Sequence, residues 1–213
     1  MEKLFSKDVS TQIQDIFKGM INPITIKLFV DGNCETCQET TQLLTETSEL
    51  SDKITLEVIE LADAGEDLVT YGIERTPSFV FLDQKGQYRG VKFNGIPAGH
   101  EINSFISAIM EMSGVEFQFS EKVLERIAKI NKPVDIKVFV TLSCPHCPGA
   151  VQTAHRLAML NSNVKGEMIE AQTFYELSTK YNVSGVPKIV INDKYELLGN
   201  QPVEEFLKKI ESI

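Results

Sequence analysis

Four cysteines are the residues of this 213-residue chain whose type and spacing could do chemistry. They form two Cys-x-x-Cys pairs, Cys34 with Cys37 and Cys144 with Cys147, and no cysteine is left over. A pair with this spacing could be a structural cross-link, half of a four-cysteine metal site, or a dithiol that is oxidised and reduced in turn. The three alternatives make different demands on the rest of the chain.

Loop length and pair spacing separate these alternatives. A disulfide that closes a four-residue loop stabilises a fold by about 2 kcal/mol, against about 4.7 kcal/mol for a 100-residue loop, so a structural cross-link is disfavoured. Zinc ribbons usually separate their cysteine pairs by about 15–20 residues, whereas 106 residues lie between Cys37 and Cys144. A redox dithiol fits best, and a zinc or iron–sulfur module held by all four cysteines remains the alternative from another class.

The chemistry of exchange assigns a role to each thiol. The thiolate is the nucleophile, and a free cysteine has a pKa near 8.5. A cysteine just before a helix lies close to unpaired N–H groups and the positive end of the helix dipole, which stabilise the anion. We therefore expect Cys34 and Cys144 to be exposed attacking thiols, and Cys37 and Cys147 to be buried resolving thiols.

The residues beside the cysteines predict two unequal sites. Pro145 suits the start of a helix, and His146, when protonated or donating, would further stabilise the thiolate of Cys144. In the first site, Glu35 lies between the cysteines and Glu39 follows one helical turn later. These carboxylates disfavour a thiolate, so we predict that CPHC is the main, more oxidising site and CETC a secondary one.

The chain contains an internal repeat at an offset of 110 residues. Six residues of the segment 24–37 recur at that offset in the segment 134–147: Ile26, Lys27, Phe29, Val30, Cys34 and Cys37. The same offset carries Pro77 to Pro187. Two long copies indicate a duplicated domain, because a solenoid needs at least three short units. We place the boundary after residue 114, which gives units 1–114 and 115–213.

Both copies predict the same order of elements. The first copy predicts helices at 9–17 and 38–50, strands at 24–30, 54–59 and 78–82, and a helix that ends near Tyr71. The second copy predicts helices at 123–130 and 150–160, strands at 134–140, 164–169 and 188–191, and a helix that ends near Tyr181. A short strand and a final helix follow in each copy. Apolar strands that alternate with helices predict an α/β fold with a sheet covered on both faces.

A cysteine pair at a strand-to-helix junction, followed by a proline that opens a later strand, resembles the thioredoxin fold. Two such units in tandem, with the phrases FNGIPAGHE, SCPHCPGAVQTAHRLA and NVSGVPKIVI, resemble the protein disulfide oxidoreductases, a glutaredoxin-like family of archaea and bacteria. The resemblance implies two tandem thioredoxin folds, each with a mixed central sheet flanked by helices. It also implies two redox-active disulfides, Cys34–Cys37 and Cys144–Cys147, that work without a metal or cofactor.

The resemblance further implies that Pro77 and Pro187 follow cis peptide bonds beside the cysteines. The backbone of the preceding residue, Thr76 or Val186, could then pair with an extended substrate segment as an added strand. Glutathione-dependent glutaredoxins usually carry Thr-Val-Pro and a later Gly-Gly. This chain has Ser-Gly-Val-Pro at 184–187 and Gly-Asn at 199–200, which favours protein substrates over glutathione.

Two Lys–Glu combinations are hypothesised to move protons. Thioredoxins place a buried Asp six residues before the first cysteine, where this chain has Leu28 and Val138. Lys27 with Glu57, and Lys137 with Glu167, lie on strands expected to be neighbours, and buried charges need partners. We hypothesise that each combination lies below its cysteine pair and that the glutamate helps to move protons; a partly exposed salt bridge is the alternative.

Composition and charge limit the partners and the location. The net charge is −9, which argues against nucleic acid as the main partner because phosphate binding needs a basic surface. The sequence shows no signal peptide and no apolar run long enough for a membrane span, so we expect a cytoplasmic protein without a membrane partner.

The expected function is thiol–disulfide exchange with protein substrates. By resemblance, reductase and oxidase activity are implied, isomerase activity is left open, a thioredoxin reductase would donate electrons, and a peroxiredoxin is a potential client. The alternative is a dedicated electron carrier between a thioredoxin reductase and a peroxiredoxin, similar to the tandem thioredoxin-fold module of alkyl hydroperoxide systems. That module typically lacks the first cysteine pair, which this chain retains.

Overall fold

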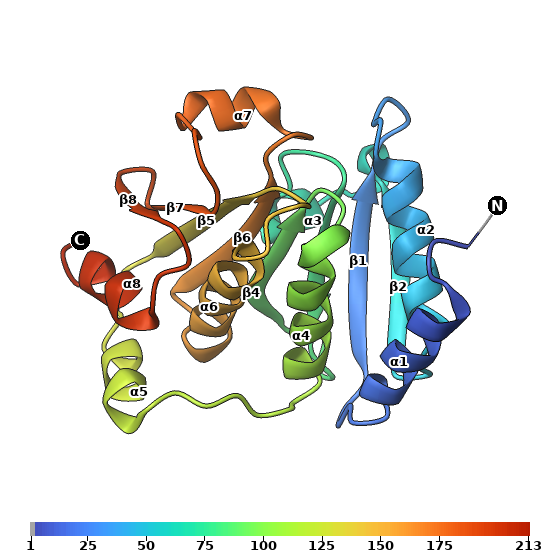
Figure 1. Ribbon diagram of the computed structural model, residues 1–213, viewed down its shortest axis with the longest axis horizontal. Helices are drawn as coiled ribbons and strands as arrows, with labels where there is room; N and C mark the ends of the chain where they lie inside the picture. The colour runs from blue at the N-terminus through green and yellow to red at the C-terminus, as the bar shows by residue number, and fades with distance from the viewer. Residues whose placement is uncertain (1–2) are drawn as a thin grey trace.

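The computed structural model describes residues 3–213 and contains the two repeats as two units with the same order of α-helices and strands (Figure 1). The first unit comprises α1 (Lys7–Phe17), β1 (Ile24–Val30), α2 (Cys37–Ser48), β2 (Ile54–Glu60), η1 (Leu61–Asp63), α3 (Asp67–Tyr71), β3 (Ser78–Leu82), β4 (Tyr88–Asn94), η2 (Gly99–Glu101) and α4 (Ile102–Met112). The second comprises α5 (Glu121–Ala128), β5 (Val134–Val140), α6 (Cys147–Leu160), β6 (Val164–Glu170), α7 (Tyr175–Lys180), β7 (Lys188–Ile191), β8 (Tyr195–Leu198) and α8 (Val203–Ile210). The predicted α/β class is confirmed.

The repeat is visible in how each unit begins. Ser6 caps α1 by accepting a hydrogen bond from the N–H of Val9 (3.3 Å), and Ser120 caps α5 through the N–H of Val123 (3.4 Å). A serine before a helix satisfies an N–H that would otherwise lack a partner within the helix. The boundary predicted after residue 114 falls in the segment that joins α4 to α5.

One sheet runs through both units. Its eight strands lie in the order β2-β1-β3-β4-β6-β5-β7-β8, and the units meet where β4 pairs in parallel with β6, from Val91 opposite Gly166 to Asn94 opposite Ile169. Because β1, β2, β4, β5 and β6 all run in the same direction, their carboxyl ends share one edge of the sheet. Both Cys-x-x-Cys segments follow strands that end at this edge, which we call the redox edge.

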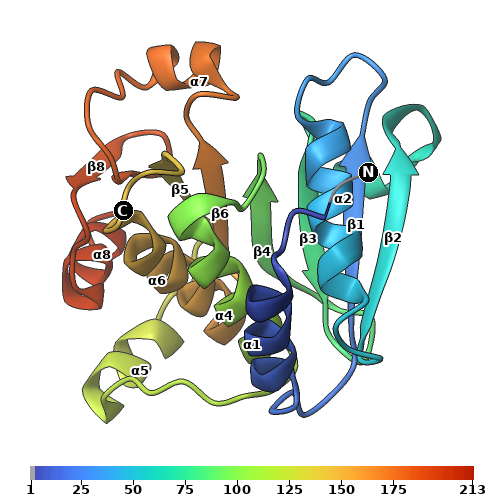
Figure 2. The ribbon, with the colours of Figure 1, turned by 45° about the vertical axis from the view of Figure 1, so that its right-hand side comes forward.

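The alternation of side chains divides the strands between two faces. On one face, Ile26 and Leu28 of β1 and Ile136 and Val138 of β5 join a core cluster that also contains residues of α1, α2, α4, α5, α6 and α8. On the other face, Phe29 packs with Tyr71 of α3, and the corresponding residues of the second unit pack with α7. Helices therefore cover one face far more completely than the other (Figures 1 and 2).

Contacts between helices also cross the boundary between the units. Arg156 of α6 donates through Nε to Glu111 of α4 at 2.9 Å, and Gln152 of α6 donates to Ser107 of α4 at 3.1 Å. Beneath them, the ring of His155 lies 4.8 Å from that of Phe93. Within residues 3–213, we find no helix with the length and apolar character needed to cross a bilayer.

Candidate functional site

The first cysteine pair lies at the redox edge, after β1. Cys37 is the first residue of α2, and Cys34 precedes it by one turn with its N–H bonded to the carbonyl oxygen of Asp31 (3.1 Å). The two cysteines form a disulfide, in which Cys34 is half-buried and Cys37 buried. Their burial follows the order expected for an attacking and a resolving thiol, and Glu35 and Glu39 beside them are exposed.

The second pair repeats this arrangement after β5 with deeper burial. Cys147 begins α6, Cys144 donates its N–H to Thr141 O (3.1 Å), and the two form a disulfide. The expectation that Cys144 is exposed is wrong, because only 8% of the residue is exposed. Cys147 is fully buried, as expected for a resolving thiol. Pro145 and His146, between the two cysteines, are exposed.

Both repeated prolines follow cis peptide bonds, Thr76–Pro77 and Val186–Pro187. Their position at the redox edge follows from strand register, because Ser78 lies opposite Phe29 of β1 and Lys188 opposite Phe139 of β5. Each proline therefore opens a strand directly beside the one that leads to a cysteine pair.

A groove of about 710 Å³ extends from the second site along α7. Its lining includes Thr141, three residues before Cys144, and Val186, which precedes Pro187. The side chains that line this groove are all uncharged. Tyr175, whose exposed fraction is 73%, separates the groove from a second one of about 640 Å³ that reaches Arg75 of the first unit. An uncharged groove thus adjoins the loop that ends at Pro187 and the start of the loop that leads to Cys144.

The hypothesis that Lys27–Glu57 and Lys137–Glu167 lie below the cysteine pairs is contradicted. The strands are neighbours in the predicted register, Lys27 opposite Glu57 and Lys137 opposite Glu167. The cysteines, however, pack in the core of the covered face, whereas these side chains project from the opposite face because they alternate with the core residues of their strands. A proton relay between them and the cysteines would have to cross the sheet.

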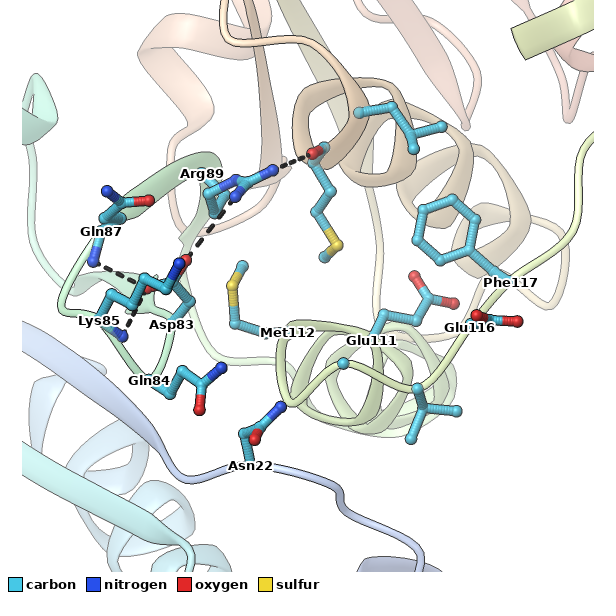
Figure 3. A pocket seen from close by; sticks show the side chains of 14 residues that line it. Asn22, Asp83, Gln84, Lys85, Gln87, Arg89, Glu111, Met112, Glu116 and Phe117 are labelled. Atoms are coloured by element: carbon cyan, nitrogen blue, oxygen red, sulfur yellow. Dashed lines mark hydrogen bonds and ion pairs between the residues drawn. The ribbon is translucent and has the colours of Figure 1, made fainter.

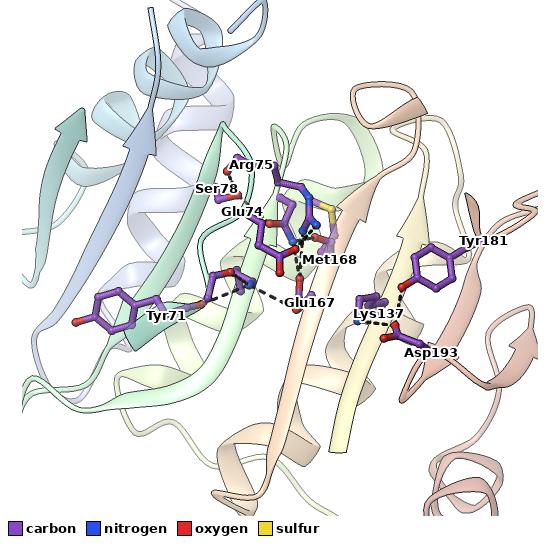
Figure 4. A network of polar contacts seen from close by, with 12 residues as sticks. Tyr71, Glu74, Arg75, Ser78, Lys137, Glu167, Met168, Tyr181 and Asp193 are labelled. Atoms are coloured by element: carbon purple, nitrogen blue, oxygen red, sulfur yellow. Dashed lines mark hydrogen bonds and ion pairs between the residues drawn. The ribbon is translucent and has the colours of Figure 1, made fainter. Parts of the chain in front are cut away.

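The predicted charge pairs are also only partly formed. Lys27 Nζ lies 3.7 Å from Glu57 but 2.8 Å from Asp67 of α3, and this hydrogen bond raises the pKa of Lys27. Among residues 3–213, Lys137 forms its ion pair with Asp193 (2.9 Å) instead of Glu167. The carboxylate of Glu167 turns toward the first unit, as Figure 4 shows.

Sequence reasoning missed a buried carboxyl group at the second site. Glu101 of η2 is fully buried, and burial raises its pKa to about 7 against a hydrogen bond from Ser104 that lowers it. Within the described chain, its Oε1 atom has no hydrogen-bond partner. The neighbouring His100 donates its N–H to Leu142 O (2.9 Å), two residues before Cys144, and η2 contacts α6. The first unit therefore supplies a buried titratable group next to the segment that contacts the loop before Cys144. A glutamate at a helix start does not reveal such burial in the sequence.

The other two histidines of the chain are His100 and His155. His155 is buried, its Nε2 lies 3.3 Å from Lys92 O, and burial lowers its pKa to about 3, so it is neutral at ordinary pH. His100 belongs to η2, which leads into α4.

A cavity of about 450 Å³ lies at the end of the sheet opposite the redox edge, where the β3–β4 turn meets the end of α4 (Figure 3). Two of its charged side chains contact neighbouring groups: Arg89 donates to Met159 O (2.8 Å) and approaches Asp83 within 3.7 Å. Because the cavity lies at the opposite end of the strands, it is remote from both cysteine pairs.

A metal site shared by all four cysteines is contradicted by the sheet order. The cysteine pairs follow β1 and β5, which are separated by β3, β4 and β6. Strand spacings of about 4.8 Å put the two strands roughly 19 Å apart, whereas thiolates in one zinc shell each lie about 2.3 Å from the metal. The four sulfurs cannot share one ion in this fold.

Comparison with curated proteins identifies similar chains that are much longer. The F subunit of the Escherichia coli alkyl hydroperoxide reductase is 28% identical over 98% of this chain, and a Bacillus subtilis protein described as NADH dehydrogenase is 28% identical over 96%. This chain spans 38% of the length of each of them.

Solved structures resemble the whole chain. The alkyl hydroperoxide reductase protein AhpF of Enterococcus faecalis superposes with a TM-score of 0.92 and 32% identity, covering 98% of this chain and 100% of that one. A protein disulfide oxidoreductase from Aeropyrum pernix superposes with a TM-score of 0.89 and 30% identity, covering 97% and 92%. A thioredoxin domain model matches residues 24–107 and again residues 134–212. The chain belongs to the thioredoxin-domain family, as two thioredoxin folds in tandem.

Proposed function

We propose that the protein exchanges electrons with protein substrates by thiol–disulfide chemistry, with CPHC as the main site and CETC as a secondary site. The observation that carries this proposal is the shared arrangement of the two disulfides, each at the redox edge beside a proline that follows a cis peptide bond. Each pair can hold two electrons as a dithiol and release them as it forms its disulfide.

In the reducing direction, the Cys144 thiolate attacks a substrate disulfide and releases one substrate thiolate, leaving a mixed disulfide. The Cys147 thiol then loses its proton and attacks the Cys144 sulfur. The second substrate thiolate leaves, and the Cys144–Cys147 disulfide forms. The substrate gains two electrons and two protons, and the CPHC dithiol loses them. The same steps in reverse oxidise a substrate dithiol.

Burial of Cys147 makes the removal of its proton the step that needs help, because a thiol surrounded by apolar groups has a raised pKa. The Glu101 carboxyl is a candidate acceptor, since it is buried where η2 contacts α6 and its pKa is about 7. A group with this pKa changes protonation near neutral pH, which suits a general base.

The uncharged groove beside Val186 supports protein substrates with little sequence preference. An extended segment could pair with the Val186 backbone as an added strand and lie along α7. The same mode is proposed for Thr76 at the first site. Isomerase activity and a cytoplasmic location stay predictions.

A second candidate function is electron transfer from a thioredoxin reductase to a peroxiredoxin. It is favoured by the similarity to the alkyl hydroperoxide reductase proteins of Escherichia coli and Enterococcus faecalis over nearly the whole chain. It can be tested by supplying a thioredoxin reductase with NADPH and comparing the rates for insulin and for a peroxiredoxin with peroxide. A rate for the peroxiredoxin at least ~100-fold higher would favour the carrier function.

The leading proposal is tested by insulin reduction with dithiothreitol as the electron source. We expect Cys144→Ser to lower the rate about tenfold, because it removes the nucleophile of the main site and leaves the slower CETC site, and Cys34→Ser to keep more than about half of it. Equal losses in the two variants would contradict the assignment of CPHC as the main site.

A further inference from the structure

Glu167 belongs to β6 of the second unit, but its carboxylate contacts the first unit. It is 7% exposed, accepts a hydrogen bond from Asn94 Nδ2 (3.1 Å), and lies 3.5 Å from Lys92 Nζ and 3.7 Å from Arg75 Nη1. All three partners come from the first unit (Figure 4). A buried carboxylate held by two cations and an amide has one well-defined position.

These partners lead directly to the cis-proline loop of the first site, residues 75–78. Arg75 precedes Pro77 by two residues, and its guanidinium also packs over the ring of Phe174 at 5.9 Å. Ser78 follows Pro77, and its hydroxyl lies 2.8 Å from Asn94 Oδ1 and 2.6 Å from Arg75 O. Both ends of the loop thus lead to Glu167: Arg75 contacts it directly, and Ser78 contacts it through Asn94.

The second site is built differently at the matching positions. The repeat replaces Arg75 by Gly185 and Ser78 by Lys188. Lys188 Nζ donates to Tyr181 O (2.6 Å) at the end of α7, within its own unit. The strand that follows the proline strand also differs: β4 pairs with a strand on each side, whereas β8 is the last strand of the sheet and pairs on one side only.

We propose that Glu167 is a positioning residue for the CETC site: it belongs to the CPHC unit but holds the cis-proline loop of the other unit in place. The inference rests on the proposed function, in which Thr76 pairs with the substrate backbone. The dependence runs in one direction. The first site needs a side chain of the second unit to fix its substrate-binding backbone, and the cis-proline loop of the second site does not need Glu167.

The test compares two full-length backgrounds, each with one active pair. The change Glu167→Gln keeps the size of the side chain and removes its charge. In the Cys144→Ser, Cys147→Ser background, we expect kcat/KM for insulin to fall about tenfold, mainly through KM, because substrate positioning is lost. In the Cys34→Ser, Cys37→Ser background we expect a change within about twofold. The matched control is Glu57→Gln, the repeat counterpart, expected within about twofold in both.

A second measurement does not depend on activity. Amide hydrogen exchange in the full chain should become at least ~10-fold faster at residues 73–78 in Glu167→Gln, and stay unchanged at residues 183–188. Arg75→Gln, which cuts the same contact from the first unit, should give the same pattern and replaces Glu167→Gln if that variant does not fold.

Unchanged exchange at residues 73–78, or equal acceleration in both segments, would overturn the proposal. Equal loss of insulin reduction in the two backgrounds would do so too, since it indicates general destabilisation. A first-site background that fails to reduce insulin before Glu167 is changed would count against the proposed function alone, and hydrogen exchange would then decide the positioning role.

Discussion

In the proposed mechanism, the two cysteines of the CPHC site take different steps of exchange because they differ in access to solvent. Cys144 retains a small exposed area at the redox edge, whereas Cys147 has none. The proposed steps follow this difference: the substrate disulfide is attacked by Cys144, and Cys147 attacks the mixed disulfide that forms there. The deep burial of the pair also means that protons must leave through neighbouring groups, which makes Glu101 the residue of greatest interest outside the cysteines.

We predict that Glu101→Gln changes the pH dependence of stability. Burial raises the pKa of Glu101 from 4.5 to about 7, so between these values the folded state binds more protons than the unfolded state and stability falls as pH rises. Glutamine carries no charge, so the variant should match the wild type near pH 4 and gain up to about 3 kcal/mol over it above pH 7. Urea unfolding at several pH values measures the difference.

The control for this prediction is Glu125→Gln, a change at an exposed position of α5. Its free energy of unfolding should differ from the wild type by a nearly constant amount across the same range. A stability difference for Glu101→Gln that does not vary between pH 4 and pH 8 would show that the carboxyl is not titrating in this interval. The proposed role as proton acceptor would then lose its basis.

At the scale of elements, the repeat made the sequence unusually informative. Strands β1, β3, β5 and β7 have the predicted ends, and the cis bonds at Pro77 and Pro187 agree with the resemblance. Helix ends moved by a few residues, as at α2 and α6, which begin at the second cysteine of each pair. Two copies of one pattern reinforce each other wherever local periodicity decides the structure.

The sequence could not reveal which face carries the charges or how the units join. Lys137 and Glu167 are neighbours in register, as predicted, but the ionic partner of Lys137 is Asp193, on the turn between β7 and β8. Glu167 in turn pairs across the β4–β6 boundary. The β4–β6 pairing occurs only once, so no repeated sequence pattern predicts it. Such long-range pairing depends on tertiary packing.

The contact between η2 and the loop before Cys144 predicts an effect of Gly99→Ala. Gly99 has a φ of +57°, and a Cβ atom there would lie 2.3 Å from Leu142 O. An alanine must strain the backbone and displace that loop, which should lower stability by about 1–3 kcal/mol. The substitution should also slow alkylation or thiol–disulfide exchange of Cys144 relative to Cys34. Mass spectrometry of the reduced protein measures both rates.

The matched control is Gly32→Ala, in the loop before the first cysteine pair. A Cβ atom at Gly32 would meet open space, so we expect its unfolding midpoint to stay close to that of the wild type. If Gly99→Ala were as stable and as reactive as Gly32→Ala, the contact between η2 and Leu142 would not support the second site.

At the scale of the whole molecule, the two units of the described chain share one sheet and one apolar core. They share a sheet through β4 and β6, and one apolar cluster contains core residues of both, including Phe93 and Val138. The buried contacts of Arg156 with Glu111 and of Glu167 with Lys92 add polar links on both faces. Duplication has thus produced two sites that share a scaffold.

A shared sheet and core predict that the two units unfold together. If the units were independent, peptides from β1 and β5 would lose protection at different urea concentrations; a common core makes the transition cooperative. Hydrogen-exchange pulse labelling at increasing urea should give midpoints for residues 24–30 and 134–140 that agree within about 0.2 M. The protein in which both pairs are changed to serine serves as the control, because neither disulfide then contributes. Separate midpoints in that control would mean that the β4–β6 pairing does not couple the unfolding of the two units. The contacts that Glu101 and Glu167 make across the boundary would then be transient and could not be fixed parts of the sites.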